Sequence, residues 1–385
     1  MKKGYLLVGL SLIIFVNQAA WITFSPVSSL VSEELGVTRH MIGLLAILFP
    51  AFFLLLTIPS GLLLDRSFHR WLTIGVLFTA AGTVLRLIYP RNYTWLLGCQ
   101  ILLATGQPFL LNSFAPFASR VYPGNKDFAV SVLSLAMYLG IIYSMGTGYF
   151  LYTRCGLVSL LVPIAVLAII GLILYVAGYQ ELIHTNNETS VTTAPRNILA
   201  EIRKVIGYRE LWLLGVVLGL GVALFDNMTI WLETVLDSIG LGNIAGIAIA
   251  AALLLGLGGV AFVPSAIARR SKRTYYIRTA TIIGIIVYGV LALYTGKVLV
   301  AVLIPLLGLV MLPAYPIIME WISTYYPREI HGGSSGFIGF VSRIFTVVLA
   351  TVAAVFTYSP RAYFMFLAGV TVIAFIVALT LPGEK

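Results

Sequence analysis

The stretch LVSLLVPIAVLAIIGLILYVAGY, residues 157 to 179, holds no charged residue and is long enough to cross the hydrocarbon layer of a membrane as one helix. Similar runs precede it, near residues 4–25, 40–62, 71–89, 94–117 and 128–152. After a polar stretch they resume near 211–234, 242–268, 275–294, 298–322, 334–357 and 360–381. We therefore predict an all-α membrane protein with twelve transmembrane helices.

The composition agrees with a chain dissolved in lipid. Of the 385 residues, 60% are hydrophobic and only 10% are charged, with a mean hydropathy of +1.01, which excludes a soluble globular protein. Cys99 and Cys155 are the two cysteines, so no disulfide framework and no zinc-ligand spacing is predicted. The spans hold neither a nucleophile with a base nor a set of metal ligands, so we expect no enzyme activity and no cofactor.

Basic residues set the predicted orientation. They gather at both termini and in alternate connections, whereas the opposite connections hold only Arg39, Arg91, Arg154, Lys297 and Arg361. By the positive-inside rule, both termini are expected in the cytoplasm and the chain in the cell (inner) membrane, as a multi-pass protein. The net charge of +10 is spread over short turns, so we expect lipid and a small solute as partners, no nucleic acid, and a monomer.

One long polar connection divides the chain. We expect a six-helix bundle over 1–180, a second over 210–385, and a cytoplasmic linker over 181–209. Residues 197–206 within the linker are expected to form a short amphipathic helix.

A turn recurs at the ends of the second and eighth spans, as Pro59-Ser60-Gly61 and Pro264-Ser265-Ala266, each followed by basic residues. The first copy resembles the loop motif G-x-x-x-D-R-x-G-x-R/K of the major facilitator superfamily. It matches at four positions and departs from the motif at Phe68, and the four matches are Gly61, Asp65, Arg66 and Arg70.

This resemblance implies the major facilitator fold, with two pseudo-symmetric halves and a substrate site at their interface, working by rocker-switch alternating access. In that fold Gly61 would let two helices approach closely, and the charges of Asp65, Arg66 and Arg70 would lock a cytoplasmic gate. The alternative is that these residues form a solvated turn.

Three stretches resemble the family of haem, choline and vitamin transporters named after the feline leukaemia virus subgroup C receptor. They are Asn17-Gln-Ala-Ala-Trp21, Gly106-Gln107-Pro108-Phe109-Leu-Leu-Asn112, and Tyr326-Pro327 followed by Gly332-Gly-Ser334-Ser335-Gly336. The resemblance implies glutamines in the cavity where this chain has Tyr138 and Arg343. A permanent positive charge there would repel a quaternary ammonium, so choline is not carried over as the substrate.

Arg343 is the most informative residue within a span. It lies about 14 Å along its helix, near the membrane midplane, and needs an anionic partner. That partner is either the substrate, which would be gripped bidentately, or Asp226 in the seventh span, as a permanent ion pair or as one that opens with substrate. If the arginine moves, Asp226 becomes the candidate proton-coupling residue.

Further polar and aromatic residues lie in spans expected to line the cavity, and a polar amide facing lipid would be costly. The predicted substrate-binding residues besides Arg343 are Asn17, Gln18, Trp21, Gln107, Asn112, Tyr138, Asn227, Trp231 and Tyr315. Arg86 is expected to snorkel to the outer surface, Glu233 to be a solvated helix end, and Glu320 to act at a gate or an interface.

We therefore predict a secondary active transporter of a small organic solute, with a proton-coupled symporter of an organic anion favoured by Arg343 and Asp226. A facilitative carrier of a choline-like amine, a vitamin or a porphyrin is the first alternative. A transport-inactive membrane receptor or a channel is the alternative from another class.

Overall fold

The computed structural model describes residues 2–188, 207–325 and 331–381, and every regular element that they form is helical. Twelve of the described helices are long and apolar enough to cross a membrane, which confirms the predicted fold class. The chain divides into two compact units, Met1–Ala194 and Pro195–Lys385. The amphipathic helix expected near 197–206 lies outside the described residues.

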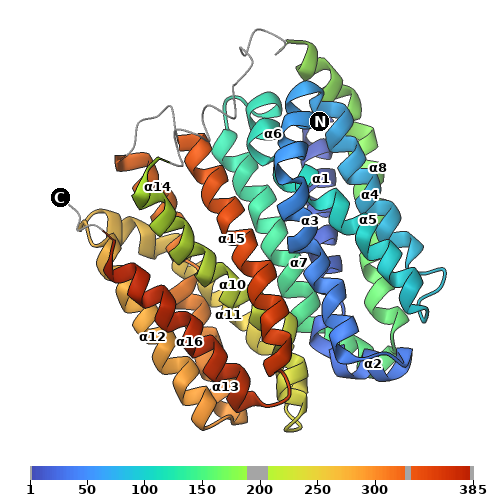
Figure 1. Cartoon of the computed structure of the whole chain (residues 1–385). Helices are drawn as coiled ribbons and strands as arrows, with labels where there is room; N and C mark the ends of the chain where they lie inside the picture. The colour runs from blue at the N-terminus through green and yellow to red at the C-terminus, as the bar shows by residue number, and fades with distance from the viewer. Residues whose placement is uncertain (1, 189–206, 326–330, 382–385) are drawn as a thin grey trace. The chain divides into compact units, whose positions relative to one another are not determined.

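The described residues of the amino-terminal unit form nine elements, of which Figure 1 labels the α-helices: α1 (Lys2–Trp21), η1 (Ser25–Val27), α2 (Ser28–Leu35), α3 (Arg39–Arg66), α4 (Phe68–Leu85), α5 (Tyr93–Leu111), α6 (Phe114–Val121), α7 (Lys126–Cys155) and α8 (Val158–Glu188). Two elements differ from the prediction. The connection after the first span is helical and ends at Gly36 with a φ of 64°, and α8 runs past residue 180 into the expected linker.

The carboxyl-terminal unit contains eight described elements (Figure 1): α10 (Arg209–Asp237), α11 (Gly242–Ala268), α12 (Arg273–Leu293), α13 (Lys297–Met311), α14 (Ala314–Tyr325), α15 (His331–Ala353), η3 (Ala354–Phe356) and α16 (Pro360–Leu379). Local capping defines several helix starts in both units. The side chains of Thr38, Asn92 and Ser359 accept hydrogen bonds from the free amides of the first turns of α3, α5 and α16.

The fourth and tenth spans, predicted as single helices, are each broken in two. The breaks fall at matching positions of the two halves, between α5 and α6 at Asn112 and between α13 and α14 at Leu312. A proline, Pro116 or Pro316, follows four residues after each position. A proline ring clashes with the carbonyl group four residues before it, which favours a break at each of these positions. Proline alone does not determine the breaks, since α3, α8 and α11 each continue through an internal proline.

Each unit has an apolar core of its own. In the amino-terminal unit, Leu10, Phe68, Phe109, Leu133 and Tyr175 bring α1, α4, α5, α7 and α8 together. Burying such side chains away from polar groups stabilises the packing of the helices around them.

The carboxyl-terminal core is built in the same way. Leu214, Ile277, Trp321, Ile338 and Ala378 bring α10, α12, α14, α15 and α16 together. Every member of this cluster lies within the carboxyl-terminal unit.

Glycines bring particular helix pairs into backbone contact. A Cβ placed on Gly308 of α13 would overlap the carbonyl group of Ala252 in α11, and one on Gly140 of α7 would overlap the carbonyl group of Phe15 in α1. Small residues allow such close approach between helices in a membrane.

We expect Gly308→Ala to lower the free energy of unfolding in detergent by about 2 kcal/mol, because α11 and α13 would have to move apart. Gly289→Ala in α12 is the matched control, since a Cβ there meets no atom within 4 Å. Denaturant-induced unfolding of the two variants measures the difference. Equal free energies of unfolding for the two variants would show that α11 and α13 accommodate the added methyl group at Gly308 without loss of stability.

Candidate functional site

An ion pair joins α10 and α15 inside the carboxyl-terminal unit. Nη1 of Arg343 lies 3.1 Å from Oδ2 of Asp226, and the hydroxyl group of Thr346 donates a hydrogen bond of 3.2 Å to the same oxygen. The Asp226 side chain is 11% exposed and the Arg343 side chain 26% exposed. A carboxylate within a membrane span therefore has a cation and a hydroxyl as partners, as the cost of an isolated charge requires.

Close packing of the two helices makes this pair possible. A Cβ on Gly219 of α10 would come within 2.8 Å of Phe345 and 3.0 Å of Ser342 in α15. Arg343 and Thr346 lie three residues apart on α15, so both face α10 one above the other.

Two other predicted site residues lie on α10. Trp231 is buried, and its Nε1 donates to the carbonyl oxygen of Ala350 at 2.9 Å. Asn227 is completely buried; its Nδ2 donates to the Ala223 carbonyl oxygen at 3.0 Å, while its Oδ1 accepts no hydrogen bond from any described residue. Tyr315 of α14 is half exposed, and its phenol lies close enough to Arg343 for an electrostatic interaction.

In the amino-terminal unit, predicted site residues on α1 and α5 form a neutral amide cluster. Nδ2 of Asn17 donates to Oγ1 of Thr79 at 3.1 Å and to the carbonyl oxygen of Leu103 at 3.2 Å, which joins α1 to α4 and α5. Nε2 of Gln18 donates to Oδ1 of Asn17 at 3.5 Å. Gln107 is buried one turn after Leu103, and its amide makes no hydrogen bond to a described residue.

The other predicted residues of this unit connect helices. Trp21 is buried and donates from Nε1 to the Ala46 carbonyl oxygen at 2.9 Å. Nδ2 of Asn112, at the break of the fourth span, donates to the Thr57 carbonyl oxygen at 2.9 Å and to Oγ of Ser60 at 2.8 Å. Tyr138 is half buried on α7. These contacts account for Trp21 and Asn112 structurally and leave their binding role as a prediction.

The predicted gate residues are exposed. Arg66 and Arg70 form no ion pair with any other residue that the structure describes, and Asp65 acts electrostatically on Arg120, whose guanidinium lies 4.4 Å from the centre of the Phe68 ring. Burial lowers the pKa of Arg120, and Asp65 partly offsets this. The gate role therefore stays a prediction.

The close approach expected at Gly61 stays a prediction. A Cβ placed there would meet no atom within 4 Å, because the residue faces open space along α3. Of the third family-like stretch, Tyr326 and Pro327 lie outside the described residues.

Arg86 does not snorkel as predicted. It is 1% exposed, and its guanidinium donates to Oε1 of Gln100, to the Ala20 carbonyl oxygen at 3.0 Å and to Oγ1 of Thr23 at 3.4 Å. Gln100 also donates to the carbonyl oxygen of Trp21 at 3.2 Å. Since the carboxyl end of a helix carries partial negative charge, Arg86 has the end of α1 as its anionic partner.

The two glutamates also differ in their surroundings. Glu233 is buried, where the sequence predicted a solvated helix end, because the packed neighbours of α10 cover it. Glu320 forms a two-pronged ion pair with Arg273, with its carboxylate oxygens 2.5 Å from Nε and 2.7 Å from Nη2. This pair joins α12 to α14, as an interface role for Glu320 requires.

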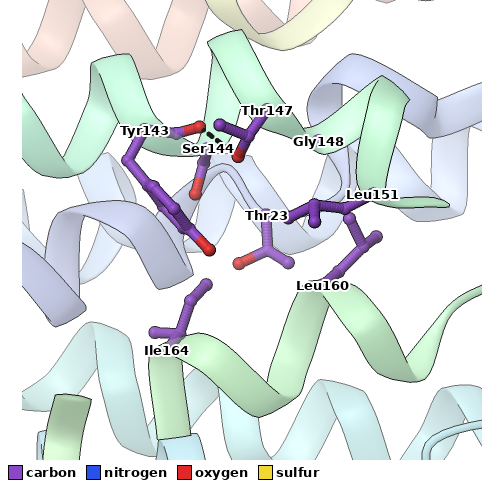
Figure 2. Close-up of a pocket in the computed structure, with 8 residues that line it drawn as sticks. All are labelled: Thr23, Tyr143, Ser144, Thr147, Gly148, Leu151, Leu160 and Ile164. Carbon is purple, nitrogen blue, oxygen red and sulfur yellow. Dashed lines mark hydrogen bonds between the residues drawn. The ribbon is translucent and has the colours of Figure 1, made fainter. Parts of the chain in front are cut away.

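A crevice lies beside the carboxyl end of α1, between α7 and α8. The hydroxyl groups of Thr23 and Tyr143 both end in this space (Figure 2), which has a volume of about 10 Å³. A space of that size holds one water molecule and is too small for an organic solute. Among the described residues, no group of three or more histidine, cysteine, aspartate or glutamate side chains is arranged to hold a metal ion.

The comparison with known proteins identifies the family. The sequence model of the Major Facilitator Superfamily matches residues 10–350. The chain belongs to this superfamily. It is 26% identical over 285 residues to solute carrier family 49 member A3 of Danio rerio, covering 71% of this chain and 60% of that protein. The chain thus spans less than two thirds of that relative's length.

The narrower resemblance is confirmed by this relative, since solute carrier family 49 is related to the feline leukaemia virus subgroup C receptor. Two solved structures share the superfamily fold. A bacterial homologue of the human lysosomal transporter Spinster, inward-facing and unoccupied, has a TM-score of 0.70 at 15% identity, covering 99% of this chain and 95% of its own. A point mutant of the nucleoside transporter NupG has a TM-score of 0.76 at 12% identity, covering 99% and 100%. Superfamily and fold make the protein a multi-pass membrane protein.

Proposed function

We propose that this superfamily member is a proton-coupled secondary transporter of a small organic anion that works by alternating access. The observation that carries the proposal is the ion pair of Arg343 and Asp226 within the membrane span, with Thr346 on the same carboxylate oxygen. Charged groups at membrane depth are costly and usually serve substrate or ion handling.

The guanidinium of Arg343 is the proposed anion-binding group. It is permanently charged, and its planar fork matches a carboxylate or a phosphate bidentately. The Arg343 side chain keeps 26% of its surface exposed, and its Nη1 donates to Asp226. An arriving anion can therefore reach the guanidinium and compete with Asp226 for it.

Asp226 is the proposed proton carrier. When the substrate draws Arg343 away, the carboxylate stays at 11% exposure with the Thr346 hydroxyl as its remaining partner in this cluster. A buried carboxylate without a cation is costly in its charged form, so it takes up a proton. Return of Arg343 to Asp226 releases the proton. In this way the movement of the anion is coupled to the movement of a proton.

The membrane orientation is part of the proposal. The distribution of basic residues supports a cell-membrane protein with both termini in the cytoplasm.

The test is uptake into liposomes that contain the purified protein. We expect a labelled organic anion from a panel of anions, zwitterions and cations to be taken up, faster with an inward proton gradient, and Arg343→Gln to abolish uptake. Arg91→Gln is the matched control, because Arg91 forms an exposed ion pair with Glu34 and its loss should leave uptake unchanged. Anion uptake that survives Arg343→Gln would contradict the proposal.

The neutral amide cluster of Asn17, Gln18 and Gln107 supports a second candidate. These residues belong to the stretches that resemble the family of the solute carrier 49 relative, and they suit a choline-like amine, a vitamin or a porphyrin carried without a proton. Uptake of such a compound that is insensitive to Arg343→Gln and to the proton gradient would favour this function.

A further inference from the structure

A short motif, Asn-x-x-x-Trp, occurs once in each unit. It reads Asn17 to Trp21 in α1 and Asn227 to Trp231 in α10, the first span of each half. Each tryptophan donates a 2.9 Å hydrogen bond from Nε1 to a backbone carbonyl oxygen of a neighbouring helix, in Ala46 and Ala350 respectively. The acceptor lies in the second span of its half for Trp21 and in the fifth span of its half for Trp231, so the comparison rests on the motif and its place in the first span of each half.

The copies differ in how the asparagine is satisfied. Oδ1 of Asn17 accepts a hydrogen bond from Nε2 of Gln18, the next residue. Met228 is the corresponding residue in the second copy, and its side chain has no hydrogen-bond donor. The Met228 sulfur accepts a hydrogen bond of 3.6 Å from the hydroxyl group of Tyr288. Oδ1 of Asn227 is left without a partner among the described residues, at 0% exposure of the side chain.

An unpaired acceptor at full burial needs an explanation, because nearly all buried polar groups are hydrogen-bonded. Its position suggests one. Gly215, Gly219 and Trp231 follow a four-residue spacing along α10 that includes Asn227, and all three contact α15. Asn227 therefore lies on α10 between Gly219 and Trp231, which both contact α15, and directly follows Asp226 in the sequence.

We propose that Oδ1 of Asn227 accepts a hydrogen bond from the transported anion, so that the substrates are carboxylates with an amine, hydroxyl or amide N–H group close to the acid. This inference rests on the proposed function, because it takes Arg343 as the group that binds the carboxylate. A site that leaves a buried acceptor unpaired discriminates strongly against an analogue without the donor. Gln18 removes this property from the first copy, and Met228 preserves it in the second.

The test compares carboxylates matched in size. Propionate, lactate and alanine form one series, and 3-phenylpropionate, 3-phenyllactate and phenylalanine form another, with binding measured as ligand-induced thermal stabilisation and as competition for uptake. In the wild type we expect at least one donor-bearing acid to bind about tenfold more tightly than its donor-free partner, as one hydrogen bond in a dry site allows.

Two variants remove the free acceptor in opposite ways. Asn227→Leu deletes it, and Met228→Gln supplies the internal donor that the first copy has, so Met228→Gln should raise the midpoint of thermal unfolding. In both variants, the donor-bearing acid and its donor-free partner should bind with nearly equal dissociation constants. Carboxylates should still compete for uptake, and this competition should still depend on Arg343.

The outcomes separate the two proposals. A donor preference that is absent in the wild type, or that survives both variants, overturns the inference while leaving an Arg343-dependent anion transporter intact. If Met228→Gln stabilises the protein and the preference persists, the acceptor is only a structural irregularity and the inference is wrong. If no carboxylate binds and Arg343→Gln changes nothing, the proposed function fails, and this inference fails with it.

Discussion

Replacing Asp226 with asparagine should destabilise the protein in detergent by about 3 kcal/mol and abolish proton-driven uptake. The substitution keeps the size of the side chain but leaves Arg343, whose side chain is only 26% exposed, without its carboxylate. Thr346 also loses a charged acceptor. Chemical denaturation gives the change in the free energy of unfolding, and the liposome assay gives uptake.

The double variant Asp226→Asn with Arg343→Gln separates structure from transport. Removing both charges should recover most of the stability lost in either single variant, because no unpaired charge remains. Uptake should stay absent, because the anion-binding group is gone. Additive losses of stability, with no recovery in the double variant, would show that the two side chains do not act as a pair.

Replacing Arg86 with methionine should lower the free energy of unfolding by about 3 kcal/mol, because acceptors at full burial lose their donor. Oε1 of Gln100 and Oγ1 of Thr23 would lose the guanidinium, and the carboxyl end of α1 would lose a neighbouring positive charge. Arg86→Lys keeps the charge but not the planar fork, so an intermediate loss is expected.

The control for Arg86 is Arg361→Met at the start of α16, where the residue is exposed and the change should stay within about 0.5 kcal/mol. Denaturant titrations of the three variants give the comparison. If Arg86→Met were as stable as Arg361→Met, the contact of Arg86 with the carboxyl end of α1 would contribute nothing to the stability of the protein.

The lengths of the apolar runs and the positions of the charged residues predicted those features that are properties of a single helix. Twelve spans follow from the lengths of the apolar runs, and a requirement for an anion near Arg343 follows from its depth. Asp226 was one of two partners that the sequence allowed, and the structure places it in contact with Arg343. The opening of this contact during transport stays a prediction, because it depends on a second arrangement of the helices.

Features that depend on packing between helices were missed. Arg86 meets the end of α1, far away in the sequence, and no local pattern distinguishes it from an arginine that snorkels. Glu233 was placed at a solvated helix end by its position in the span, but neighbouring helices bury it. The helix breaks at Asn112 and Leu312 had a local signal in Pro116 and Pro316, which span counting by hydropathy does not use.

The separate cores of the two units have a consequence for how the protein is made. Nothing in the core around Leu10, Phe109 and Tyr175 comes from beyond α8, so the first six spans can complete their packing while the ribosome is still translating the second six. A nascent chain halted in the region between the units should already hold a protease-resistant first half. Errors of synthesis in the second half would then leave the first half intact.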